Sequence, residues 1–103
     1  MAHSRQLHEW ADRFAILGDP SRLCLLVLIH HDGPISVGDL SEASGLKPTT
    51  VSHALRVMRM QGVVGDARVG RSKLYRIVDD ATGALLDTLP AAGRPSITLE
   101  NGP

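Results

Sequence analysis

Aromatic residues and cysteine are scarce in this chain, and each scarcity narrows the possible structures. Only three of the 103 residues are aromatic, namely Trp10, Phe14 and Tyr75, so the hydrophobic core must be largely aliphatic. The single cysteine, Cys24, excludes an internal disulfide framework and a thiolate cluster within one chain. We therefore expect a reducing, cytoplasmic setting in which Cys24 is a small core residue. A redox sensor formed by Cys24 of two subunits is the alternative.

Long hydrophobic runs are lacking as well. The longest apolar stretch, residues 23–29, is too short to span a bilayer, and the N-terminal segment contains no apolar signal core. We expect neither membrane insertion nor export. The chain also has no HExxH motif, no glycine-rich phosphate loop and no recognisable Ser or Cys nucleophile, so we do not expect an enzyme.

Net charge is absent too, because eleven Lys and Arg residues balance eleven Asp and Glu residues. Taken as a whole, this neutrality argues against a polyanionic partner. Residues 47–76, however, carry seven cations and one anion, a net charge of +6, and the segments on either side carry −3 each. Contacts with phosphates need a local basic surface rather than a basic protein, so the distribution of charge still allows a nucleic-acid partner.

The feature that is present throughout most of the chain is helical periodicity. Apolar residues recur at helical spacing in five segments, which Gly and Pro residues separate. Residues 23–29 are apolar nearly all round, so the second helix is predicted to be buried at the centre. Between Val63 and Val78, two short apolar segments around a Gly-Arg tip predict a β-hairpin. The predicted fold is mainly α, with helices over residues 6–18, 20–30, 37–44, 48–62 and 81–89 and a small hairpin over residues 63–78.

The third and fourth predicted helices are typical of a helix-turn-helix, since a short turn containing Gly45 joins them. The second helix of this motif enters the major groove of DNA. The face of the fourth helix opposite its apolar stripe carries side chains that can bond a base edge or a phosphate, and cations surround the hairpin tip. A merely solvated helix face is the alternative. The candidate DNA-binding residues are Lys47, Thr49, Thr50, Ser52, His53, Arg56, Arg68, Arg71 and Lys73.

Four stretches of the chain resemble the ArsR/SmtB family of winged-helix transcriptional regulators. They are LGDPSR at 17–22, VSHALRVMR at 51–59, GVV at 62–64, and GRS at 70–72 with Tyr75, and the resemblance covers residues 10–89. It implies a homodimer joined through the first and last helices, with two recognition helices in successive major grooves of an imperfect inverted repeat in operator DNA. Such proteins usually repress, and they leave DNA when an effector binds, most often a metal ion.

The resemblance and the periodicity together divide the chain into three parts. We expect a flexible N-terminal arm over residues 1–5, a winged helix-turn-helix DNA-binding domain over residues 6–89, and a disordered tail over residues 90–103. A second hypothesis is a winged-helix protein that has lost operator binding and acts through a partner or co-regulator protein. The basic segment 47–76 favours the first hypothesis.

The chain departs from the family at the residues that hold metal ions. The family's thiolate site has Cys-Val-Cys-Asp-Leu where this chain has SVGDL at 36–40, so soft ions that need several thiolates are not expected. At the family's last-helix site, Asp79 matches the first ligand, but Ala81 replaces a histidine. Some nickel or cobalt sensors of the family use an N-terminal arm that bears histidine.

A different metal site therefore becomes the working hypothesis. We consider a site for nickel, cobalt or zinc across the dimer, formed by His3, His8 and Asp79. The alternative is an N-terminal segment that contains two histidines by chance. His30 and His31 are expected to be solvent-exposed side chains at the C-terminus of the second helix.

Overall fold

The computed structural model describes residues 2–90 of the chain, and the side chains from residue 4 onward. The predicted architecture, mainly α with a small hairpin, is confirmed, and one additional short strand is present. The predicted tail lies outside the described residues except for Pro90. In chain order the elements are α1 (Ala2–Leu17), α2 (Pro20–Asp32), β1 (Ile35–Ser36), α3 (Val37–Ser44), α4 (Pro48–Met60), β2 (Val64–Val69), β3 (Ser72–Ile77) and α5 (Asp80–Asp87).

Helix α2 lies at the centre of the hydrophobic core, as its uniformly apolar sequence predicts. All six residues from 24 to 29 are buried, and the helix packs against α1, α3, α5 and β3. Asp19 caps its first turn by accepting a hydrogen bond from the backbone N–H of Arg22 at 2.9 Å. Cys24 is one of these core residues, and burial raises the pKa of its thiol, which disfavours the reactive thiolate.

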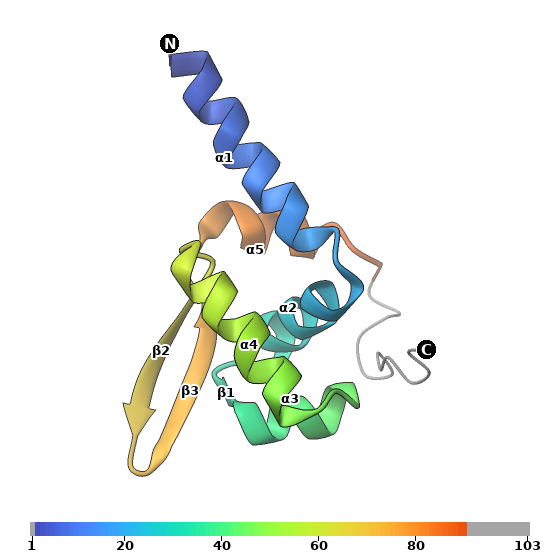
Figure 1. The fold of residues 1–103 in the computed structure, drawn as a ribbon, viewed down its shortest axis with the longest axis vertical. Helices are drawn as coiled ribbons and strands as arrows, with labels where there is room; N and C mark the ends of the chain where they lie inside the picture. Colours follow the sequence, from blue (N-terminus) through green and yellow to red (C-terminus); the bar gives the residue numbers. More distant parts are fainter. Residues whose placement is uncertain (1, 91–103) are drawn as a thin grey trace.

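Helix α1 begins at Ala2 and includes residues 2–5, which the sequence analysis assigns to an N-terminal arm. Hydrophobic periodicity starts only at Leu7, because the N-terminal turns extend beyond the body of the domain and have no core to bury against (Figure 1). The segment before Gly18 contains neither Gly nor Pro, so nothing in it opposes the helix. Periodicity therefore predicts α1 only from residue 6 onward, and most of the apolar residues that create it are exposed in the single chain.

The hairpin is part of a three-stranded antiparallel sheet with the strand order β1-β3-β2. Ile35 and Ser36 of β1 pair with Tyr75 and Leu74 of β3. A strand of two residues is too short to show alternation, which is why the sequence pattern contains no sign of it. This pairing anchors the base of the hairpin to the segment that enters α3.

The elements are arranged so that the two ends of the molecule differ. Figure 1 shows α3, the start of α4 and the hairpin tip at one end, and α1 projecting from the other end above α5. In the described part of the chain, no single helix is long and apolar enough to cross a membrane. Residues 4–17 and α2 meet that requirement only together, as a pair bent by 94°.

Candidate nucleic-acid interface

The turn between α3 and α4 is fixed by local hydrogen bonds. Ser36 caps α3 by accepting from the backbone N–H of Asp39 at 3.1 Å, and Gly45 ends the helix with a φ of 80°, in the left-handed region that favours glycine. The hydroxyl of Ser41 donates to the carbonyl of Leu46 at 2.6 Å, and the Leu46 N–H donates to the hydroxyl of buried Ser44 at 3.1 Å. These bonds set the direction in which α4 leaves the turn.

Helix α4 has one buried face and one exposed polar face. Val51, Ala54, Leu55 and Met58 are buried against the core. All five of its predicted DNA-binding residues are exposed, and four of them line, together with Pro48, an open groove of 400 Å³; these four are Thr49, Ser52, His53 and Arg56. Thr50 is exposed outside that groove.

The N-terminus of α4 is also open to solvent. Lys47 occupies the N-cap position without a side-chain capping bond, and Pro48 begins the helix. The backbone N–H groups of the first turn therefore receive no side-chain cap from Lys47, and they carry the positive end of the helix dipole. An anionic group that approaches this turn meets both these donors and the cation of Lys47.

The hairpin extends the basic surface beyond α4. Strands β2 and β3 pair in register from Val64↔Ile77 to Val69↔Ser72, and Gly70 forms the tip with a φ of 62°. Arg68, Arg71 and Lys73 are all exposed near this tip, as predicted. Two further cations of the basic segment, Arg59 on α4 and Arg76 on β3, are exposed as well, although the sequence analysis did not select them.

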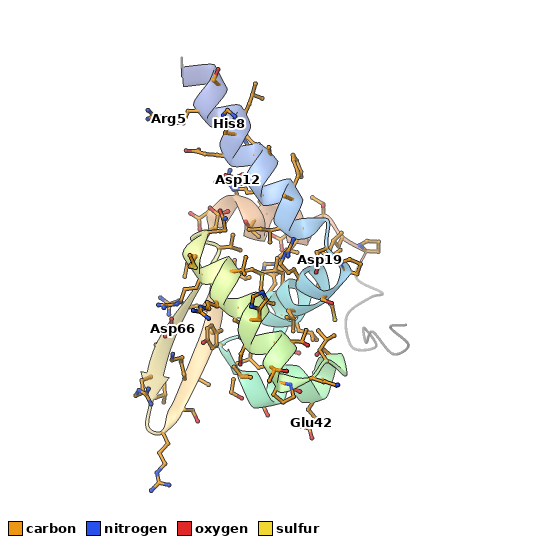
Figure 2. All side chains as sticks on the ribbon, in the orientation of Figure 1. Arg5, His8, Asp12, Asp19, Glu42 and Asp66 are labelled. Carbon is orange, nitrogen blue, oxygen red and sulfur yellow. The ribbon has the colours of Figure 1, made fainter. Side chains whose placement is uncertain are left out.

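The structure describes the side chains of two of the three predicted metal ligands, His8 and Asp79. The side chain of His3 lies outside the description, and His8 is an exposed residue of α1 (Figure 2). Among the described residues, no group of three His, Cys, Asp or Glu side chains could hold a metal ion. The described residues of one chain therefore do not form a metal site by themselves.

Asp79 has a different role, which its position before α5 explains. Both of its carboxylate oxygens accept hydrogen bonds from the guanidinium of Arg13 on α1, from Nε at 2.8 Å and from Nη2 at 3.2 Å. The carboxylate also caps α5 by accepting from the backbone N–H of Thr82 at 3.1 Å and from the Thr82 hydroxyl. The Arg13 hydrogen bond lowers the pKa of Asp79 to about 2. A metal ion at Asp79 would have to displace Arg13.

His30 provides a second link to α5 that the sequence analysis missed. Its Nε2 lies 2.6 Å from Oδ1 of Asp87, and its side chain is partly buried, which corrects the prediction of a solvent-exposed histidine. His31 is exposed as predicted, and its ring contacts that of His30 at a centroid distance of 5.3 Å. His30 and Asp87 are 57 residues apart in the chain, so local sequence could not indicate the pair.

Comparison with families and known proteins gives a consistent result. The family model described as "Bacterial regulatory protein, arsR family" matches residues 19–65. The HTH-type transcriptional regulator NmtR of Mycobacterium tuberculosis is 43% identical over 84 residues, which are 82% of this chain and 69% of that protein. The transcriptional repressor SmtB homolog of Synechocystis is 37% identical over 75 residues, which are 73% of this chain and 56% of that protein.

Solved structures agree with the sequence comparisons. The solution structure of apo-NmtR superimposes with a TM-score of 0.68 at 40% identity and covers 82% of this chain and 70% of that chain. A homodimeric winged helix-turn-helix DNA-binding domain from Mycobacterium bovis gives a TM-score of 0.73 at 27% identity, covering 82% of this chain and 78% of that chain. The predicted winged helix-turn-helix fold class is therefore confirmed.

Proposed function

Because the chain belongs to the ArsR family of bacterial regulatory proteins, we propose that it binds duplex operator DNA as a homodimer, through α4 and the β2–β3 hairpin. The family consists of DNA-binding transcriptional regulators, so the chain is a regulator and not an enzyme. One observation carries the proposal: the exposed face of α4 and the hairpin tip together place the basic segment on one end of the molecule. A regulator that binds chromosomal DNA acts in the cytoplasm.

The division of labour on this surface follows from residue chemistry. Thr49, Ser52, His53 and Arg56 line one groove on α4, from which they can meet base edges in a major groove. Thr50 lies beside that groove. The cations supply contacts with phosphates, which are independent of base sequence; those of the hairpin are Arg68, Arg71 and Lys73, and Lys47 lies at the start of α4.

The second copy of the chain has a surface to occupy at the other end. On α1, the apolar side chains of Leu7, Trp10 and Phe14 are 70%, 39% and 56% exposed. Beside them lies an apolar groove of 210 Å³ between α1, α2 and α5, lined by Leu17, Leu23, Leu85, Leu86, Thr88 and Leu89. Exposed apolar residues that cluster in this way mark an interaction surface. The homodimeric domain from Mycobacterium bovis supports a second copy as the occupant.

A titration of DNA tests the proposal directly. Fluorescence anisotropy is measured on the duplex upstream of the gene for this protein and on a scrambled duplex of the same composition. We expect a clear preference for the upstream duplex and a slope of log K against log salt of about −7, since about eight phosphates per dimer are neutralised. Equal affinity for the two duplexes would contradict sequence-specific binding and would favour action through a partner protein.

The effector is proposed to be nickel, cobalt or zinc, bound with His3 and His8 as ligands. The imidazole nitrogens of these two histidines are ligands of the kind that suits these ions. Asp79 contributes only if it leaves Arg13, and the geometry described above weighs against that. Titration of each metal into the wild type and into the His3→Ala/His8→Ala double variant is the test. A metal affinity that is the same in both proteins would remove the two histidines from the site.

A further inference from the structure

Asp66 is the one anion within the basic segment 47–76. It lies on β2 of the hairpin, where its side chain faces cations of α4 and β3 (Figure 2). Its Oδ1 lies 3.5 Å from Nη1 of Arg59, in the last turn of α4. Its Oδ2 lies 4.0 Å from Nζ of Lys73, on β3. The side chain of Asp66 is only 19% exposed, whereas both cations are about half exposed. One carboxylate thus joins the two elements that are proposed to contact DNA.

The strand register explains why Asp66 occupies this place. Alternate residues of a strand point to the same side, so Val64, Asp66 and Arg68 share one face of the hairpin, and Tyr75 and Lys73 share it on β3. Val64 and Tyr75 are buried, so this face is the one that turns toward the core. Arg68 is paired directly with Lys73, and like charges in that position repel. Asp66, diagonal to Lys73, offsets the repulsion.

Three other cations of the proposed interface differ from Arg59 and Lys73 in this respect. Among the residues that the structure describes, Arg56, Arg68 and Arg71 form no ion pair. These three are therefore available to DNA without breaking an interaction. Arg59 and Lys73, in contrast, must be shared between Asp66 and a phosphate, so each of them contributes less to binding on an arbitrary sequence.

We propose that Asp66 is a positioning and specificity-determining residue for DNA binding, which holds Arg59 and Lys73 back from the phosphates and fixes the hairpin against α4. The inference rests on the proposed function. Non-specific binding rests on phosphate contacts in which any accessible cation can take part, whereas contacts with bases fix the register of the specific complex and leave Arg59 and Lys73 paired with Asp66, so holding these cations back lowers non-specific binding more than specific binding. A carboxylate on a DNA-facing surface thereby raises the ratio of specific to non-specific affinity, although it lowers total attraction to DNA.

The experiment uses the full chain with the upstream duplex and its scrambled counterpart, over a range of salt concentrations. Asp66→Asn keeps the shape of the side chain and removes its charge. We expect it to raise affinity for the scrambled duplex by about tenfold and to steepen the salt slope on that duplex by about 1 per protomer, since one negative charge is removed. Affinity for the upstream duplex should rise much less, so the specificity ratio falls. Asp66→Glu, which keeps the charge, should restore both the slope and the ratio toward those of the wild type.

The matched control is Asp12→Asn, which makes the same change of charge on α1, at the other end of the molecule (Figure 2). It should leave the slope and the ratio unchanged. The proposal is overturned if Asp66→Asn behaves like this control, or if it weakens binding to both duplexes equally without altering the slope, because the latter result indicates a purely structural role.

A second measurement covers the case in which Asp66→Asn does not fold. Arg59→Gln should leave the salt slope on the upstream duplex unchanged, since Arg59 stays paired with Asp66 in that complex; a slope that becomes shallower by about 1 there would overturn the inference. Failure of the proposed function looks different, because the wild type itself would then show no preference for the upstream duplex. In that event the role of Asp66 falls with it.

Discussion

The two ends of the molecule differ in charge and in how completely one chain packs them. At the end formed by α3, α4 and the hairpin, hydrogen bonds fix the turn and the apolar face of α4 is buried; residues 47–76 carry seven cations and one anion, and α3 adds the two anions Asp39 and Glu42. At the end formed by α1 and α5, α1 carries two cations and two anions, α5 with its cap Asp79 carries three anions and no cation, and the apolar residues Leu7, Trp10 and Phe14 are exposed. The first end is complete within a single chain, whereas the second is not.

This difference indicates which kind of interaction can stabilise a complex at each end, electrostatic at the first and hydrophobic at the second. The basic end repels a second basic end and attracts phosphates, so it is suited to DNA. The acidic end avoids phosphates and presents apolar area, so it is suited to a second copy of the chain. A net charge of zero is the sum of two surfaces with opposite tasks. Amino-acid substitutions at each end test this comparison.

The largest expected effect is on dimer formation. Trp10→Ala combined with Phe14→Ala should raise the dimer dissociation constant by about 100-fold or more, because large aromatic side chains dominate such interfaces. Sedimentation analysis over a range of protein concentrations measures it. Val69→Ala is the matched control, since Val69 is 59% exposed but lies on the hairpin. An equal effect of both changes, or none from the double variant, would show that the acidic end is not the dimer interface.

The next effect concerns the basic end. Arg56→Ala should cost about 1–3 kcal/mol of binding to the upstream duplex, and it should reduce preference at one base position if Arg56 reads a base. Anisotropy titrations with base-substituted duplexes measure both quantities. Arg5→Ala removes the same charge from α1 and should change affinity little (Figure 2). Equal loss on every sequence would assign Arg56 to a phosphate instead.

A smaller effect is expected on stability. Asp79→Ala removes the cap of α5 and the partner of Arg13, so the free energy of unfolding should fall by about 1–2 kcal/mol. Urea denaturation measures it. Asp80→Ala, at the neighbouring exposed position in the first turn of α5, should cost much less. If the two variants are equally stable, the Arg13 and Thr82 contacts do not stabilise the acidic end.

The smallest expected effect is the pH dependence of the stability that the Arg13–Asp79 pair contributes. The folded pKa of Asp79, about 2, lies below its ordinary value of 3.8, so the ionised carboxylate is the form that the fold stabilises. This contribution is fully present above about pH 4 and is lost as the pH falls through about 2. The difference in unfolding free energy between the wild type and Arg13→Met should therefore shrink over that range. Arg5→Met should show no such trend.

The sequence predicted the basic end more completely than the acidic end, for a physical reason. Gly45, Pro48 and the alternation of buried and exposed residues along α4 are local signals, and they sufficed to place every predicted DNA-binding residue on an exposed surface. The hairpin followed from two short apolar segments around Gly70. Each of these features acts over a few neighbouring residues, which is the range that sequence patterns report.

The acidic end depends on contacts between distant residues, which leave no local pattern. Arg13 and Asp79 are 66 residues apart, and His30 and Asp87 are 57 residues apart. Asp79 is the N-cap of α5, but its pairing with Arg13 could not be inferred from sequence patterns. The same limitation applies to Asp66, whose two partners become neighbours only when the hairpin folds against α4. The strand β1 was missed because two residues carry no periodicity.

Asp79 has a mechanical consequence for the whole domain. The carboxylate of Asp79 pairs with Arg13 of α1 and also caps the first turn of α5 through Thr82. A rotation of α1 that withdraws Arg13 therefore leaves the negative charge of Asp79 without its ion-pair partner. Unfolding of the first turn of α5 in turn displaces the carboxylate that Arg13 binds. Helices α1 and α5, from opposite ends of the chain, thus share one carboxylate, so a displacement of either helix changes the contacts of the other.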